Sequence, residues 1–319
     1  MATTAPVITT RTSPLKIREL PALLLLGVSL IWLLSAKPSF RSVENLTQIG
    51  QQAGLLGIMA CGEAMVILTG GVDLSVGAIA AVAACVAGGR MHGGGHWLLA
   101  VLLGIAAGAL GGWLNGALIT YRKLTPILTT LATLLLFRAL TNIETGAVPF
   151  NQLPLAFTKL GTGYAPLLAF LIVVSALALM LARTRFGRRV VAVGGSEQAV
   201  RLSGVPTDAI LRRVYMVSGV CAAIGGLLMA AASNSAQWNI ADGFELEVIA
   251  AVVIGGVRLT GGEGSVIGAG LGALIIVVMR NALFLYGVPT EQYGLITGAI
   301  ILLAAFAEQA RRVREARAA

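Results

Sequence analysis

The chain alternates long apolar runs with short polar segments, and most of the runs have the length of a membrane-spanning helix. A helix needs roughly 20 apolar residues to cross the hydrocarbon core of a bilayer. The pattern predicts ten spans, or eight if the two shortest are broken or re-entrant helices. The spans are 20–35, 47–69, 72–89, 97–119, 126–144, 166–182, 211–232, 244–258, 265–286 and 291–307, of which 72–89 and 244–258 are the short ones.

The apolar runs are continuous rather than alternating, which favours helices over the strands of a membrane barrel. In a helix every backbone polar group is satisfied within the same segment, as hydrocarbon requires. The predicted fold is therefore an all-α polytopic membrane protein. We divide the chain into an N-terminal tail (1–19), a transmembrane region (20–307) with a long polar loop at 183–213, and a basic C-terminal tail (308–319).

Composition supports an integral membrane protein. The chain is 57% hydrophobic and only 12% charged, with a mean hydropathy of +0.87, whereas about a quarter of the residues in soluble proteins are charged. The 40 glycines suit a helix bundle in lipid, because small residues let helix backbones approach closely. The net charge of +9 does not indicate nucleic-acid binding, since the basic residues are dispersed among loops without an aromatic-interleaved surface.

The lysines and arginines predict the orientation of the chain. If the N-terminus is cytoplasmic, two of the 23 basic residues fall within spans, Arg138 and Arg280, and nearly all others fall on the inner side. The basic residues that fall in outer segments are Lys37, Arg41, Arg90 and Lys159. This asymmetry follows the positive-inside rule, so both termini and the loop 183–213 are expected in the cytoplasm.

The sequence lacks the motifs of ATPases and of membrane-embedded enzymes. Without a GxxxxGK[ST] phosphate-binding loop, ATP-driven work would need a separate chain. Without HExxH, GxSxG or a Cys/His constellation, we expect no catalytic residue, no metal site and no cofactor bound by this chain. Cys61, Cys85 and Cys221 lie in apolar runs and are interpreted as packing residues. His92 and His96 bracket three glycines, which favours a loop over a helical metal site.

Polar residues within apolar spans are costly in lipid, so they are expected to face a cavity or a partner helix. Glu63 is interpreted as lining a path or pairing with another helix, with solvation near the headgroups as the alternative. Asp73 and Ser75 lie in GGVDLSVG and are expected to cap the helix that follows. A gate at a helix break is the alternative interpretation of this pair.

Further polar residues lie near the ends of spans, where they are candidates for contact with a hydroxyl-rich solute or for positions at the headgroup level. Asn115 and Asn281 each precede a loop with proline, and 70–75 is similar to 255–260. These similarities suggest an inverted repeat, with chance resemblance as the alternative. The candidate residues of the path or gate are Glu63, Asp73, Ser75, Asn115, Asn142, Asn234, Gln237, Arg280 and Asn281.

The loop 183–213 combines many arginines with a short predicted helix. Ser196 is predicted to cap a helix at 197–203, with Glu197 at its positive end and Gly204 in the left-handed conformation beyond it. Anionic lipid would attract the arginines but does not explain a capped helix, so we interpret this segment as a docking site for another protein. The arginines are Arg183, Arg185, Arg188, Arg189, Arg201, Arg212 and Arg213.

Three separated motifs resemble the permease subunits of ribose-type bacterial ABC importers. They are VILTGGVDLSVG at 66–77, VGGSEQAVRLSGV at 193–205, and FELEVIAAVVIGG at 244–256 followed by GGEGS at 261–265. The resemblance extends over residues 40–307. The main departures are Arg258, Arg280 and the HGGGH turn, and they leave the transported sugar open.

The resemblance implies a multi-pass permease of the bacterial inner membrane that imports a monosaccharide. Related permeases carry furanose signalling molecules or nucleosides. The implied partners are a second permease copy, identical or related, a cytoplasmic ATPase subunit or tandem ATPase that binds ATP and Mg, a periplasmic sugar-binding protein, and membrane lipid. The residues implied to couple to the ATPase are Gly194, Gly195, Ser196, Glu197, Ala199, Arg201, Leu202 and Gly204.

A competing hypothesis is an ion-coupled secondary transporter of a small polar solute. In that case Glu63 would be the proton or cation site, because an ionisable residue within a span is a functional candidate.

Overall fold

A computed structural model describes residues 19–296, 298–299, 302 and 306. Residues 1–18 of the expected N-terminal tail and the expected C-terminal tail at 308–319 lie outside the described residues, as does part of the expected span 291–307. The helices are α1 (Leu20–Ala36), α2 (Val43–Leu68), α3 (Val76–His92), α4 (Trp97–Arg122), α5 (Pro126–Thr145), α6 (Leu155–Thr158), α7 (Ala165–Arg183), α8 (Arg185–Gly195), α9 (Glu197–Leu202), α10 (Thr207–Ser233), α11 (Phe244–Ile254) and α12 (Val266–Leu285); the 3-10 helices are η1 (Pro38–Arg41), η2 (Lys159–Gly161) and η3 (Thr290–Gln292); the strands are β1 (Phe150–Asn151) and β2 (Ser235–Ala236).

Six of the described helices, α2, α4, α5, α7, α10 and α12, are long and apolar enough to cross a membrane. The expected span 72–89 is represented by α3, which has 17 residues, and the expected span 244–258 by α11, which has only 11. Both short spans are therefore short helices. The structure is an all-α polytopic membrane protein, as the apolar pattern predicts.

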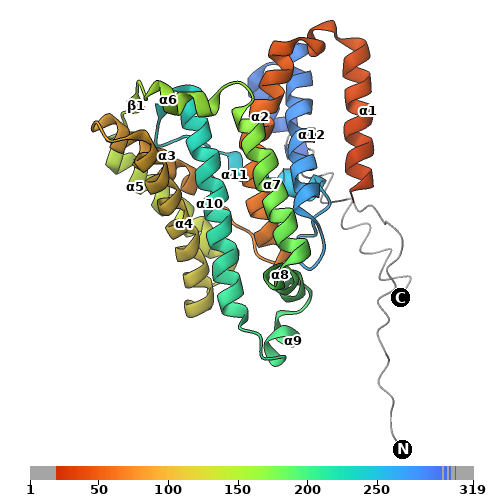
Figure 1. The fold of residues 1–319 in the computed structure, drawn as a ribbon. Helices are drawn as coiled ribbons and strands as arrows, with labels where there is room; N and C mark the ends of the chain where they lie inside the picture. The colour runs from red at the N-terminus through yellow and green to blue at the C-terminus, as the bar shows by residue number, and fades with distance from the viewer. Residues whose placement is uncertain (1–18, 297, 300–301, 303–305, 307–319) are drawn as a thin grey trace, which may run out of the picture.

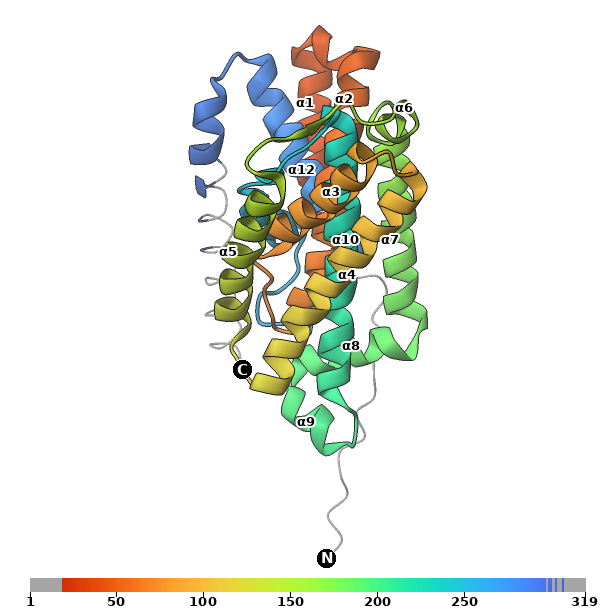
Figure 2. The same ribbon diagram turned by 90° about the vertical axis from the view of Figure 1, so that its left-hand side faces the viewer.

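The bundle has two ends, which Figures 1 and 2 show at the bottom and the top of the molecule. We call the lower one, where α8 and α9 lie, the α9 end, and the upper one, where η1 and α6 lie, the η1 end. Near the η1 end, β1 and β2 form a short antiparallel pair in which Phe150 faces Ala236. The helices α2 and α10 form the centre of the bundle, since 83% and 72% of the residues in their most apolar stretches are buried. The helix α7 is peripheral, because only 17% of the corresponding stretch is buried.

Hydroxyl side chains define where several helices begin. Ser42 caps α2 by accepting a hydrogen bond from the Asn45 amide at 3.2 Å, and Ser265 caps α12 by accepting from the Gly268 amide at 3.0 Å. Such bonds satisfy backbone N–H groups that have no partner in the first turn of a helix. Pro126 begins α5, a position where the missing N–H costs nothing.

A glycine stripe on α4 brings this helix against α10 (Figure 2). The glycines recur every four residues, so they share one face of the helix. A Cβ atom at Gly108 would lie 2.5 Å from Cβ of Ala223, and one at Gly112 would overlap the carbonyl group of Tyr215. In lipid, helices associate through close packing of this kind. The stripe consists of Gly104, Gly108, Gly112 and Gly116.

The helices α2 and α11 end in the same turn. After α2, Gly70 has φ of +82° and the Gly71 amide donates to the Val66 carbonyl; after α11, Gly256 has φ of +84° and the Val257 amide donates to the Val252 carbonyl. Both are Schellman turns, in which a left-handed glycine ends the helix. The similar sequences at 70–75 and 255–260 thus correspond to the same kind of turn. The sequence alignment differs from the structural one by one residue, because the left-handed residue is the first glycine of the pair after α2 (Gly70) and the second glycine of the pair after α11 (Gly256).

Gly112→Ala is expected to destabilise the bundle, because the added methyl group overlaps the Tyr215 carbonyl. Overpacking of a tight contact costs roughly 1–3 kcal/mol, so the midpoint of thermal unfolding in detergent should fall. Gly111→Ala is the matched control on the same helix, since its Cβ would make ordinary contacts, 3.4 Å from Ile79 and 3.5 Å from Phe137. Equal midpoints for the two variants would contradict a requirement for close approach of α4 and α10.

Candidate functional site

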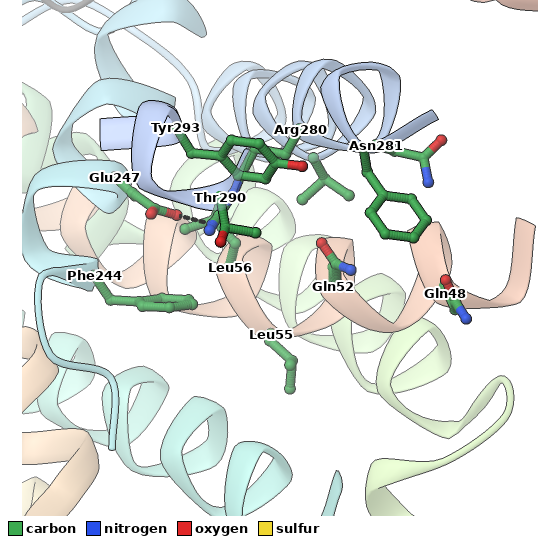
Figure 3. A pocket seen from close by; sticks show the side chains of 12 residues that line it. Gln48, Gln52, Leu55, Leu56, Phe244, Glu247, Arg280, Asn281, Thr290 and Tyr293 are labelled. Atoms are coloured by element: carbon green, nitrogen blue, oxygen red, sulfur yellow. Dashed lines mark hydrogen bonds and ion pairs between the residues drawn. The ribbon is translucent and has the colours of Figure 1, made fainter. Parts of the chain in front are cut away.

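A pocket of about 340 Å³, with both apolar and polar side chains in its wall, opens among α2, α11, α12 and the segment around η3 (Figure 3). It lies toward the η1 end, since Gln48 and Gln52 come from the first turns of α2. The pocket is lined by Gln48, Gln52, Leu55, Leu56, Phe244, Glu247, Val277, Arg280, Asn281, Phe284, Thr290 and Tyr293. Its wall therefore mixes amides, an acid, a base and aromatic rings.

An ion pair crosses one side of this pocket. Arg280 Nη1 of α12 lies 2.6 Å from Glu247 Oε2 of α11, and the two side chains are 29% and 19% exposed (Figure 3). The guanidinium also lies 5.9 Å from the ring centre of Tyr293. Both charged groups are partly exposed to solvent. Each can therefore replace a hydrogen bond to water by one to a polar solute, and the cost of removing water from the charges is small. The pair therefore gives the pocket both hydrogen-bond donors and acceptors.

Behind the pocket, Asn281 is engaged by another side chain. Its Nδ2 donates to Asn45 Oδ1 at 2.6 Å, and Asn45 Nδ2 donates in return to Asn281 Oδ1 at 3.2 Å. Asn45 Nδ2 also donates to the Phe40 carbonyl at 3.1 Å. This buried amide pair ties the beginning of α2 to α12. Asn281 thus holds the wall of the pocket in place, while Arg280 presents its charge to the interior.

A second set of candidates forms a buried polar cluster in the centre of the bundle. Glu63 and Asp73 are both 0% exposed, and Glu63 Oε1 accepts a hydrogen bond from the Asp73 amide at 2.9 Å. Asn115 Nδ2 donates to Ser75 Oγ at 2.7 Å, and Asn115 Oδ1 accepts from Thr133 Oγ1 at 2.7 Å. The cluster joins α2, the α2–α3 connector (69–75), α4 and α5. Solvation of Glu63 near the headgroups is therefore excluded.

Capping of α3 differs in detail from the expectation. Asp73 Oδ1 accepts hydrogen bonds from the Ser75 amide at 2.9 Å and from Ser75 Oγ at 2.6 Å, so Asp73 closes a tight turn before the helix. Ser75 itself, the residue before α3, accepts no capping bond from the helix. The Ser75 hydroxyl instead donates to Asp73 and accepts a hydrogen bond from Asn115, so it belongs to a network that connects separate helices.

The remaining path candidates do not line the pocket. Asn234 ends α10 with φ of +51°, and its Oδ1 accepts a hydrogen bond from the Leu153 amide at 3.0 Å. Gln237 is half-buried in the segment after β2, where its carbonyl accepts from the Ile240 amide at 3.1 Å. Asn142 lies half-buried near the end of α5. A role for these three residues in transport stays a prediction from the sequence.

The segment 196–204 forms the helix that the sequence predicts. Ser196 Oγ accepts a hydrogen bond from the Ala199 amide at 3.2 Å, α9 ends at Leu202, one residue earlier than expected, and Gly204 has φ of +77°. The helix lies at the lower tip of the molecule (Figure 1). It has no buried residue, and Leu202 is 83% exposed. A single exposed apolar side chain is common on protein surfaces, so a docking role for α9 rests on its sequence motif and stays a prediction.

An ion-pair network holds α9 against its neighbours. Arg201 Nη2 lies 2.5 Å from Glu197 Oε1 and 2.9 Å from Asp208 Oδ1, and Lys123 Nζ lies 3.1 Å from Asp208 Oδ2. The hydrogen bond to Glu197, and then the charge of Asp208, raise the pKa of the Arg201 guanidinium above its ordinary value. Exposed pairs contribute little to stability singly. Their effect here is geometric, because they orient α9 relative to α10 and the end of α4.

Several residues of these sites were missed by reasoning from the sequence. In the pocket they are Gln48, Gln52 and Glu247, and near α9 they are Lys123 and Asp208. The two glutamines are four residues apart near the start of an expected span, which places them on one face of a helix. That spacing was a usable signal. Lys123 and Asp208 carried none, since they pair across distant segments.

A bundle of apolar helices with a pocket near one end and an exposed, capped helix at the other is the architecture of a polytopic membrane protein and suits a permease. Comparison with known proteins agrees with this class. The family described as "Branched-chain amino acid transport system / permease component" matches residues 45–305, so the chain belongs to this family. No solved structure matches the chain significantly.

Individual relatives are import permeases. The chain is 36% identical over 274 residues to a ribose import permease protein of Bacillus subtilis, covering 84% of this chain and 85% of the relative. It is 36% identical over 307 residues to a ribose import permease protein of Escherichia coli, covering 92% and 94%. A galactose/methyl galactoside import permease protein of Escherichia coli is 34% identical over 303 residues, covering 87% and 90%.

Arg280→Glu is expected to destabilise the wall of the pocket, because it places a second carboxylate beside Glu247. The cost should be roughly 1–3 kcal/mol, below that of a fully buried pair, because solvent reaches both side chains. Thermal unfolding in detergent measures it. The control is the swapped variant Glu247→Arg/Arg280→Glu, which should recover most of the loss. A swapped variant no more stable than the single one would contradict the pairing.

Proposed function

We propose that this chain is the membrane-spanning permease of an ATP-driven ABC importer. The observation that carries the proposal is α9, a capped helix with an exposed Leu202 and no buried residue, in a chain of the permease family. ATP and Mg belong to a separate ATPase subunit, or a tandem ATPase, into which α9 docks. ATP binding closes two motor domains, and each pulls on one α9 in a pair of permease copies, identical or related.

The solute that we propose is a monosaccharide, delivered by a periplasmic binding protein. Relatives over most of the chain are named for ribose and for galactose or methyl galactoside import, which supports this class over an amino acid. A permease protein of an autoinducer 2 import system in Photorhabdus luminescens is 34% identical over 294 residues, so a furanose signalling molecule is the second candidate. A ligand screen of the co-purified binding protein by thermal shift, with ribose, galactose and leucine, tests the class.

The pocket toward the η1 end supports the same solute class. Amide side chains and a solvent-accessible ion pair exchange hydrogen bonds with hydroxyl groups, and the rings of Phe244 and Tyr293 provide apolar faces. Weak contacts are sufficient here, since the binding protein selects the solute and the permease must release it. The η1 end accordingly faces the periplasm.

The α9 end faces the cytoplasm in this proposal, in the bacterial inner membrane, with both termini on the same side as α9. The exposed arginines of α8, Arg185, Arg188 and Arg189, support the orientation, because basic residues are retained on the cytoplasmic side and attract anionic headgroups.

Glu197→Lys is expected to uncouple ATP hydrolysis from transport, because it breaks the bonds of Glu197 with Arg201 and Thr207 and reverses the charge of α9. Sugar uptake by vesicles that contain the whole importer should fall roughly tenfold or more, as for central charges of an interface. Glu44→Lys, the same charge change on the first turn of α2, is the control and should leave ATPase binding unchanged. Unchanged uptake in the Glu197→Lys importer would refute docking through α9.

Glu63→Gln distinguishes the ABC importer from an ion-coupled transporter. The amide oxygen of glutamine still accepts the Asp73 N–H, so the cluster and sugar uptake should be preserved within about twofold. An ion-coupled transporter would lose uptake, because glutamine carries no titratable proton. Glu63→Leu is the companion variant, expected to destabilise the protein by roughly 1–3 kcal/mol, since it leaves a buried N–H without an acceptor.

A further inference from the structure

Three chain segments that lie far apart in the sequence meet at one point near the α9 end. They are the end of α8 at Gly194, the end of α2 at Leu68, and the loop between α11 and α12 at Gly262. The Gly262 amide donates a hydrogen bond to the Leu68 carbonyl at 3.0 Å. Each segment belongs to a different one of the three motifs that carry the family resemblance.

The contact is between backbones, because no side chain fits there. A Cβ atom at Gly194 would overlap both the Leu68 carbonyl oxygen and the Gly262 nitrogen. One at Gly262 would lie 2.9 Å from the Gly195 nitrogen, and one at Gly261 would lie 2.7 Å from the Gly70 nitrogen. We call this contact of 68–70, 194–195 and 261–262 the glycine junction.

Each segment leads from the junction to a different working part of the molecule. Three residues beyond Gly194, the chain enters α9. Beyond Gly70, it enters the connector to α3, where Glu63 and Asn115 hold Asp73 and Ser75. The junction therefore links the docking helix to one of the two short helices through a few backbone atoms.

The third segment leads to the other short helix. Gly262 lies in the loop that connects α11 to α12. The two ends of this loop are joined by a hydrogen bond of 2.9 Å from the Arg258 amide to the Glu263 carbonyl, and the side chains of the same two residues form an ion pair of 3.1 Å. Ser265 then caps α12. A displacement of Gly262 therefore acts on α11 and α12 together.

We infer that the glycine junction is the rigid joint through which α9 moves α3 and α11, and that Gly70, Gly194 and Gly262 are positioning residues of transport. The inference rests on the proposed docking of α9 to an ATPase. Packed backbones have no side-chain rotamers that could absorb a displacement, and close-packed interiors transmit strain. A pull on α9 thus reaches both short helices in one step.

A second contact supports the same route. A cavity of about 330 Å³ lies beside the junction, and its wall includes Glu197 and Arg201 of α9, Gly71 of the connector, and Tyr215 of α10. Tyr215 is 1% exposed, and a Cβ atom at Gly71 would lie 2.6 Å from its hydroxyl oxygen. Tyr215 thus packs closely against the connector from the side of α10, so the connector is held on that side as well as at the junction.

The first test is Gly262→Ala in vesicles that contain the complete importer, with its ATPase and binding protein. The ATPase should remain bound, because Gly262 lies outside α9, while sugar taken up per ATP hydrolysed falls roughly tenfold. Gly94→Ala is the matched control: its φ of +77° equals the +76° of Gly262 within one degree, but its Cβ would meet no described atom within 4 Å. Equal uptake per ATP in the two variants would overturn the inference.

The second test uses the wild-type protein. It therefore tests the inference even if the Gly262→Ala variant fails to insert into the membrane. Hydrogen exchange of the wild-type importer is compared between the nucleotide-free state and the state trapped with ATP and vanadate. The amides of 68–75 and 258–264 should change together with those of 194–204. A change confined to 194–204 overturns the inference and leaves docking intact. No protection of 197–204 by the ATPase in any state overturns the docking itself, and the inference with it.

Discussion

Direct contact between backbones is the constraint on which the structure depends. Lipid gives helices no hydrophobic reason to associate, so contact must come from close packing. Glycine on α4 permits it against α10, and Gly255 and Gly272 permit it between α11 and α12, where a Cβ atom would overlap a carbonyl of the facing helix. Close backbone contact at the glycine junction likewise joins the ends of α2 and α8 to the loop between α11 and α12. Stability and transmission of movement therefore rest on one kind of contact.

The polar side chains are divided according to what each environment tolerates. In the centre, Glu63 and Asp73 are fully buried, and the cluster around them uses hydroxyl and amide groups from several helices. Toward the η1 end, Glu247 and Arg280 remain in contact with solvent and with each other. At the α9 end, Arg201 and Asp208 are exposed, and their attraction is screened. The pocket toward the η1 end thus combines half-buried charges with access for a solute.

Features that depend on local sequence were predictable, and features that depend on the pairing of distant segments were not. The apolar runs predicted most helices, and Ser196 with Gly204 predicted α9, because caps and turns are decided by neighbouring residues. Only part of the pocket was predicted. Arg280 is recognisable as a charged residue within an expected span, but its partner Glu247 lies on a different helix, the short α11. The reciprocal bonds of Asn45 and Asn281 have no local signature, since 236 residues separate them.

The buried position of Glu63 has a consequence for how the protein is made. A charged residue opposes insertion of an apolar helix into the bilayer by roughly 2.5–3.5 kcal/mol at the helix centre, and by less near the helix end, where Glu63 lies in α2 (Val43–Leu68). The Asp73 amide, which donates to Glu63, and the side chains of Asn115 and Thr133, which complete the cluster, all follow it in the chain. During synthesis α2 therefore reaches the membrane before its polar neighbours exist, and its buried environment is complete only when α10 and α12, which pack against it, have also left the ribosome. Assembly around Glu63 in this sense involves both halves of the chain.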